Sequence, residues 1–470
     1  MSVQFWVLVA FLVLVFLTGG GSRADIQSLL VLRPAAVLAC GIGFCTLSSR
    51  HVASYRLLFI LVAAAFILVV IHLAPLPPYI WKSLPGHDIV ADADRLAGLG
   101  DVWRPLSMLP SGTWNAFYSL FIPLAVLVLG VQLGRKEQYS LLLLFIVAGL
   151  LSGGIGLLQV LGAPDGPLYL YRITNNGSAV GLFSNRNHQA FYLACLFPML
   201  AVYASTGVQT VEQGRFRLWI SIAAGVVLVP LLLVAGSRAG LAAGALGLAS
   251  IPALYSKPRF DRPEKRTVRR FNPNYLYTGI GVFALSLLTI LLARAQAFER
   301  LVAPDQANDL RFSVWGPIFE MAWKYFPFGS GIGSFVEVYQ IDEPLNLLTP
   351  AYLNRAHNDW LEVWLTAGVP GALLLLSSVL GIAFSSYSAW RRMERQRRST
   401  LFARLGSILL GLAMLSSISD YPVRVPSIMS LLVVALLWLR GGSIPASGAA
   451  NVPNKDGTAN NTPLADQKRF

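Results

Sequence analysis

Charged residues are scarce in this sequence of 470 residues: Asp, Glu, Lys and Arg make up only 13% of it, whereas soluble proteins carry about 25%. Cysteine is scarcer still, because only Cys40, Cys45 and Cys195 occur, all in apolar segments. Three such thiols give no disulfide framework. No CxxC or HExxH spacing occurs either, so we expect no metal site and no cofactor.

Long hydrophobic runs are abundant in the sequence. Hydrophobic residues make up 55% of it and cluster in runs of roughly 16 to 22, long enough to cross the ~30 Å hydrocarbon core as helices. Strands of a membrane β-barrel alternate polar and apolar residues, which these continuous runs do not. The sequence therefore predicts an all-α polytopic membrane protein. We expect about twelve transmembrane helices, at residues 3–18, 29–46, 57–74, 116–134, 139–161, 179–204, 218–235, 239–255, 274–293, 371–390, 402–418 and 425–439.

The net charge of +14 is concentrated in one set of loops, which argues against nucleic-acid binding. Every second loop between the predicted spans, taken with Arg404, carries 19 Lys or Arg against 5 Asp or Glu, and the opposite loops carry 14 against 16. This asymmetry follows the positive-inside rule and places both termini in the cytoplasm. The segment 441–470 is rich in Gly, Ala, Asn and Pro, so we expect a disordered cytoplasmic tail.

Most of the remaining sequence falls on the outer face, in loops at 75–115, 162–178 and 294–370. The largest loop contains two amphipathic helix patterns, WGPIFEMAWKYF and HNDWLEVWL, whose aromatic residues suit a membrane interface. We expect the second helix to carry His357 and to end at Gly368. Between them, PFGSGIGSF lacks the GxGxxG spacing of a dinucleotide site. It is either a tight turn that needs positive φ or a backbone nest for an anion.

Three arginines and a histidine stand out on the outer face, since a charge near lipid is costly without a partner or water. They are Arg186, Arg238, Arg311 and His357. Each has a purely structural alternative. Arg186 could cap a helix or fix the topology, Arg238 could reach lipid phosphate, and Arg311 could pair with a neighbouring acid. His357 could cap its helix or pair with one of the carboxylates that follow it.

Taken together, these side chains suit a different chemistry. Two or three guanidinium groups at one membrane face fit an anionic headgroup, above all a diphosphate with its several acceptor oxygens. They would also stabilise charge that grows on a diphosphate leaving group. An imidazole, with an ordinary pKa near 6.5, can accept the proton of an attacking hydroxyl as that bond breaks.

Four stretches, in order, resemble the O-antigen ligase and polymerase superfamily of bacterial envelope glycosyltransferases. They are GLFSNRNHQAFYLACLFPML, GSRAG, RFSVWGPIFEMAWKYFPFGSGIGSF and AHNDWLEVWLTAGVPG. The stretches cover about residues 180–390 of a predicted membrane domain at 1–440, and the last one is the most specific. The resemblance implies a metal-independent, inverting glycosyltransferase in the bacterial inner membrane.

The resemblance also implies substrates and roles. The donor would be a glycan on undecaprenyl diphosphate at the periplasmic face, and the acceptor a sugar hydroxyl of lipid A-core or of a growing polysaccharide chain. In a catalytic loop at 294–370, His357 would be the base, while Arg238 and Arg311 would bind the diphosphate and Arg186 would be a further contact. The supporting residues would be Asn185, Asn187, Asn358, Asp359 and Glu362.

Two alternatives to this function remain open on the sequence. The chain could be a transporter or flippase of lipid-linked glycans or small anions, or a scaffold for other polysaccharide-assembly proteins. The motifs also do not separate a ligase from a polymerase. Arg33 and Arg424 receive no role from the sequence, although the first lies inside a predicted span.

Overall fold

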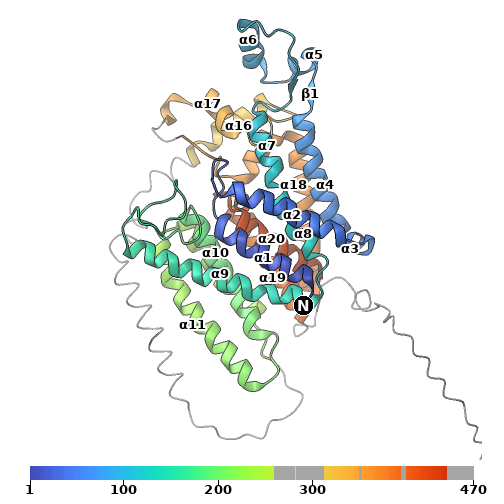
Figure 1. The fold of residues 1–470 in the computed structure, drawn as a ribbon. Helices are drawn as coiled ribbons and strands as arrows, with labels where there is room; N and C mark the ends of the chain where they lie inside the picture. Colours follow the sequence, from blue (N-terminus) through green and yellow to red (C-terminus); the bar gives the residue numbers. More distant parts are fainter. Residues whose placement is uncertain (259–280, 282–311, 349–351, 393–397, 442–470) are drawn as a thin grey trace, which may run out of the picture.

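In the computed structural model, the described residues are 1–258, 281, 312–348, 352–392 and 398–441. They form a helical body with a smaller cap at one end (Figure 1). The helices of the body are α1 (Val3–Thr18), α2 (Leu29–Thr46), α3 (Ser49–Ser54), α4 (Arg56–Leu73), α7 (Pro110–Ser119), α8 (Phe121–Gly130), α9 (Arg135–Leu161), α10 (Arg186–Ser205), α11 (Val211–Ala235), α12 (Arg238–Ala249), α13 (Ile251–Leu254), α18 (Asp359–Arg391), α19 (Arg398–Ser416), η2 (Pro422–Arg424) and α20 (Pro426–Gly441).

The cap is built from two outer segments that are far apart in the sequence. Its elements are β1 (Pro75–Leu76), α5 (Pro78–Trp81), α6 (Asp88–Leu96), β2 (Arg104–Pro105), α16 (Trp315–Lys324), α17 (Phe335–Ile341) and η1 (Leu345–Leu347). The two short strands pair in antiparallel fashion. Of the aromatic stripe expected on α16, Ile318 and Ala322 are buried, whereas Phe319 and Trp323 are about half exposed. The predicted stripe is therefore split between the cap's interior and its surface.

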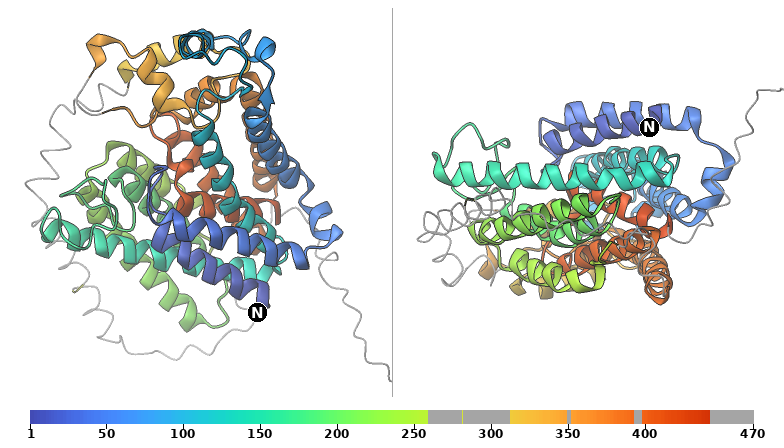
Figure 2. Two further views of the ribbon diagram at one scale, coloured as in Figure 1. Left: turned by 45° about the horizontal axis from the view of Figure 1, so that its top comes forward. Right: turned by 90° about the horizontal axis from the view of Figure 1, so that it is seen from below.

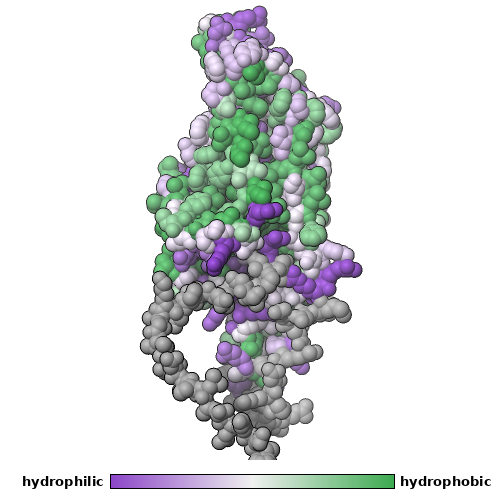
Figure 3. Space-filling view, turned by 90° about the vertical axis from the view of Figure 1, so that its right-hand side faces the viewer, coloured by the Kyte–Doolittle hydropathy of each residue, from purple (hydrophilic) through white to green (hydrophobic). Residues whose placement is uncertain are grey.

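The body has the dimensions and surface of a membrane protein. Seven helices or helix pairs among the described residues are long and apolar enough to cross a membrane, and α1, the α12–α13 pair and α20 are shorter apolar helices. Large apolar side chains such as Leu373, Leu380 and Phe384 of α18 are more than half exposed. Figure 3 shows an apolar band between hydrophilic ends. Such a band is stable in lipid rather than in water.

Eleven of the twelve predicted spans coincide with described helices, and the span at 274–293 lies outside the described residues. The exact number of crossings stays a prediction. One boundary is wrong: the span expected from residue 179 begins only at Arg186. Gly181 has φ +58°, and a Cβ there would lie 2.4 Å from the Ser152 carbonyl oxygen. This close backbone contact keeps the apolar residues before Arg186 out of the helix.

The centre of the body is formed by α10, α19 and α20. Nearly every side chain of α10 and most of those of α20 are buried. Viewed from below, the red C-terminal helices lie between the blue N-terminal pair and the orange α18 (Figure 2). A helix that is apolar all round needs such a position. The polar start of α10 is thereby placed inside the protein.

The basic loops in the described part of the chain gather at the end of the body opposite the cap (Figure 1). The Gln138 side chain donates to the Tyr55 hydroxyl, and Gly207 lies against Arg217 and Arg398. These contacts join four of the loops that the charge pattern assigns to one side, in two pairs: 47–56 with 135–138, and 205–217 with 391–401. The grouping agrees with the predicted topology, while the side of the membrane on which each end lies stays a prediction.

A glycine-rich turn between α16 and α17 packs against α18 and so fastens the cap to the body. Gly329, Gly331 and Gly333 have φ values of +82°, +106° and +91°. The backbone N–H groups of Ser330 and Gly331 donate to carbonyls of α18, and that of Ile332 donates to His72 Nδ1. The turn interpretation of PFGSGIGSF is thus confirmed, and these N–H groups are used internally rather than presented to an anion.

Gly368 interrupts α18 at the expected place, but the helix resumes at once instead of ending there. Its φ of +56° allows close contact with the glycine-rich turn, because a Cβ at Gly368 would lie 2.2 Å from the Pro327 carbonyl oxygen. We expect Gly368→Ala to destabilise the protein by about 1–3 kcal/mol. Gly316→Ala is the matched control, since a Cβ there meets open space in α16. Thermal unfolding of both variants in detergent checks the difference; equal melting temperatures would contradict it.

Candidate active site

His357 lies immediately before α18 rather than within it. Asn358 is the N-cap residue, and its side chain accepts a hydrogen bond from the backbone N–H of Leu361. The prediction that the helix carries His357 is therefore wrong, as is the alternative that His357 caps it. His357 has φ +50°, and its side chain is 12% exposed. Because this backbone region is uncommon for residues other than glycine, the conformation marks a tightly specified position.

A single carboxylate joins His357 to a second histidine. Asp420 Oδ1 lies 3.9 Å from His357 Nδ1 and 3.7 Å from His188 Nε2. The side chains of Asp420 and His188 are almost completely buried. The ring of Tyr421 lies 5.0 Å from each imidazole ring, centroid to centroid. These four residues form the histidine cluster, and its buried carboxylate can stabilise a positive charge on either imidazole.

A second cluster lies beside the first and holds the start of α18. Arg424 Nε donates to Asp359 Oδ1 at 2.7 Å, and Arg424 Nη1 lies 3.2 Å from Glu362 Oε1. Arg355 Nη1 donates to the same Glu362 oxygen at 3.0 Å. Ser417 Oγ donates to Asp359 Oδ2. The carboxylates proposed as partners of His357 therefore pair with two arginines, and this arginine–carboxylate cluster gives Arg424 a role.

The two asparagines of the motif, Asn185 and Asn187, lie at the start of α10. Asn185 is the N-cap, and its side chain accepts from the backbone N–H of Asn187 at 2.9 Å. Arg186 is the first residue of the helix and is partly exposed. Its backbone N–H donates to Asn175 Oδ1. One turn of helix thus presents Arg186 at the surface and His188 to the histidine cluster.

Arg238 begins the neighbouring helix, α12, and is exposed. Ser237 is the N-cap residue, and its hydroxyl accepts from the N–H of Gly240. Gly240 packs directly against Ala190 of α10. The structure therefore brings the helix starts that carry Arg186 and Arg238 together. Arg311 lies outside the described residues.

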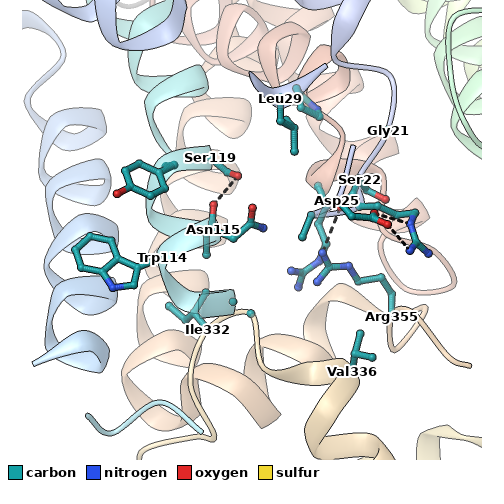
Figure 4. A pocket seen from close by; sticks show the side chains of 18 of the residues that line it. Gly21, Ser22, Asp25, Leu29, Trp114, Asn115, Ser119, Ile332, Val336 and Arg355 are labelled. Atoms are coloured by element: carbon teal, nitrogen blue, oxygen red, sulfur yellow. Dashed lines mark hydrogen bonds and ion pairs between the residues drawn. The ribbon is translucent and has the colours of Figure 1, made fainter. Parts of the chain in front are cut away.

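A cavity of about 1060 Å³ adjoins the arginine–carboxylate cluster. Arg355 and Arg424 lie in its wall, as does Asn354, whose side-chain nitrogen is 3.5 Å from the Tyr421 hydroxyl. Figure 4 shows that the opposite wall comes from α7, with Asn115 and Ser119. The cavity and the histidine cluster thus share a boundary. This volume is ample for a bound substrate.

The sequence did not identify Asp420 as a site residue. Its signal is weak: one acid in SSISDYPVRVP, a short turn between two apolar runs on the predicted outer face. Pairing Asp420 with His188 and His357 requires the packing of α10 against α19, which no periodicity in the sequence provides. Arg33, also without a predicted role, contacts the side chains of Asn115 and Ser119 at the cavity.

Comparison with known families gives the site a chemical context. Residues 223–376 match the O-antigen ligase family model. This O-antigen ligase segment includes Arg238, Arg311 and His357, whereas His188 and Asp420 come from the flanking chain. The match over this segment confirms the resemblance seen in the sequence. None of the curated proteins matches the sequence significantly.

Proposed function

We propose that the protein transfers a glycan from undecaprenyl diphosphate to a sugar hydroxyl at the periplasmic face of the bacterial inner membrane. The acceptor belongs to lipid A-core or to a growing polysaccharide chain. One observation carries the proposal: the histidine of the O-antigen ligase segment shares a buried carboxylate with a second histidine. A purely structural loop would not need two imidazoles around one carboxylate.

The reaction follows from this arrangement. The acceptor hydroxyl oxygen attacks the anomeric carbon of the donor sugar from the face opposite the diphosphate, so the configuration inverts. As the new carbon–oxygen bond forms, the bond to the diphosphate oxygen breaks and undecaprenyl diphosphate leaves. The hydroxyl proton moves to neutral His357, and Asp420 stabilises the resulting imidazolium. These steps require no metal or cofactor.

The arginines at the starts of α10 and α12 suit the leaving group. Arg186 and Arg238, with Arg311, would donate charge-assisted hydrogen bonds to the diphosphate oxygens. Two helix N-termini point at the same region, which further favours an anion. The arginine–carboxylate cluster lies at the end of the body that carries the cap, since the cavity beside it is also lined by Val336 and Glu337 of α17. This clustering at one face supports transfer there over transport along a path through the body.

We expect Arg238→Ala to lower kcat/KM for the lipid-linked donor roughly 10- to 100-fold, because a charge-assisted hydrogen bond contributes about 1.5–3 kcal/mol. Arg238→Lys keeps the charge but loses the paired donors, so its loss is expected to be smaller. Transfer is measured with purified protein in lipid nanodiscs, using donor extracted from a strain that lacks the protein. If both variants match the wild type, Arg238 reaches only lipid phosphate, and the donor site must lie elsewhere.

A further inference from the structure

The cavity beside the arginine–carboxylate cluster is not used by the chemistry described so far. Its walls come from the chain before α2 and the start of α2, from α7 and the start of α8, from the glycine-rich turn and the start of α17, and from the segments before α18 and around η2. Figure 4 shows Asn115 on the side of α7 that faces Asp25 and Arg355 across the space, and Trp114 on the other side of that helix. These elements are far apart in the sequence, so the cavity exists only in the folded protein.

The charges of the lining do not suit a diphosphate. Of its four arginines, Arg23 forms a double ion pair with Asp25, and Arg355 and Arg424 pair with the carboxylates of α18. Arg33 contacts only neutral oxygens within the described part of the chain, and Glu337 adds a negative charge to the wall. A diphosphate needs several cations without carboxylate partners. The cavity offers hydrogen bonds instead of excess positive charge.

Its remaining lining suits a carbohydrate. Trp114, Tyr118 and Tyr352 lie in the wall and are each about half exposed. The Trp114 and Tyr118 rings are stacked at 5.8 Å with 25° between their planes, which makes a platform for the C–H face of a sugar ring. Asn115, Ser119 and the guanidinium of Arg33 also lie in the wall and provide donors and acceptors for hydroxyl groups. The buried Nε of Arg33 has no hydrogen-bond partner among the described residues.

The position of the cavity beside the proposed base indicates that it holds the acceptor rather than the donor. Asn354 lies in the wall and contacts Tyr421, whose ring lies against His357. A general base must reach the hydroxyl of the acceptor. Arg186 and Arg238, proposed to bind the donor diphosphate, are not part of the cavity wall. We propose that this cavity holds the acceptor glycan, with its reactive end at His357, an inference that rests on the proposed transferase function.

Photocrosslinking in living cells tests which molecule occupies the cavity. p-Benzoylphenylalanine replaces Tyr118 in the wall, or, as a control, Phe384 on the exposed face of α18, in a strain that lacks the native protein. After irradiation, the purified protein is analysed by mass spectrometry. The expected adduct at position 118 carries sugars without an undecaprenyl chain, and position 384 captures only phospholipid. An undecaprenyl-linked glycan at position 118, or phospholipid at both positions, overturns the assignment.

Kinetics separate failure of this inference from failure of the proposed function. With donor and glycolipid acceptor fractions extracted from the same deletion strain, Trp114→Ala is expected to raise KM for the acceptor roughly tenfold and leave KM for the donor unchanged. Trp114 contacts only Phe117 and Tyr118 among the described aromatic rings, so its removal spares the core. A rise in the donor KM instead overturns the acceptor assignment. If the wild type transfers no glycan at all, the transferase proposal itself fails.

Discussion

Replacing His357 with alanine is expected to reduce glycan transfer by about 10²- to 10⁴-fold, the usual contribution of a general base. Without the imidazole, the acceptor hydroxyl has no group to take its proton as the bond to the diphosphate breaks. In cells, lipid-linked glycan then accumulates and the finished product disappears. Gel electrophoresis and mass spectrometry measure both species, and a blot checks the protein level. Accumulation of a single repeat unit indicates a polymerase, and accumulation of a full chain indicates a ligase.

Two controls separate chemistry from backbone strain in this experiment. His357 has φ +50°, so alanine there carries a conformational cost that does not concern the base. His357→Asn tolerates this region better but cannot accept the proton in the same way, and it is expected to be equally inactive. His51→Ala removes an imidazole that bonds only Ser48 within its own turn, and normal output is expected. Normal product from both His357 variants would falsify the base assignment.

Local sequence patterns predicted the helices of the body well. The apolar runs at 3–18 and 29–46 correspond to α1 and α2 residue by residue, since runs of this length have few other solutions in a membrane. The patterns failed where tertiary contacts decide the conformation. The residues before Arg186 are apolar enough for a helix, but the close approach of Gly181 to Ser152 holds them in a loop.

Only part of the candidate site could be predicted from the sequence, because tertiary contacts bring the rest of it together. Motif resemblance pointed to His357 and Arg238, because these residues lie in recognisable stretches. His188 and Asp420 join the site through packing between α10, α19 and the turn before α20, which brings together residues more than 200 positions apart. The expected partners of His357, Asp359 and Glu362, are bound by arginines instead. Sequence spacing alone does not reveal which of several nearby carboxylates a histidine meets.

Arg424→Ala is expected to destabilise the protein by about 3–5 kcal/mol, because it leaves the buried carboxylate of Asp359 without its cation and that of Glu362 with Arg355 alone. The Glu362 side chain is only 2% exposed and that of Asp359 12%, so water cannot replace the guanidinium fully. Thermal unfolding in detergent measures the loss. Arg95→Ala provides the contrast: the Arg95–Asp92 pair is exposed at the surface of α6, and its removal is expected to cost less than about 1 kcal/mol.

A double substitution tests whether the lost stability comes from the unpaired charge itself. In the Arg424→Ala background, Asp359→Asn removes one of the carboxylates that Arg424 neutralised, and part of the lost stability should return, with a coupling energy of about 0.5–3 kcal/mol. If Asp359→Asn instead lowers the stability of the Arg424→Ala variant as much as it lowers that of the wild type, Arg424 acts by packing and not by charge. If stability returns in this way, the arginine–carboxylate cluster also matters for catalysis. The cluster holds the first turn of α18, which begins two residues after His357. Folded protein with the double substitution should then transfer glycan more slowly than the wild type, because the base is no longer held in place.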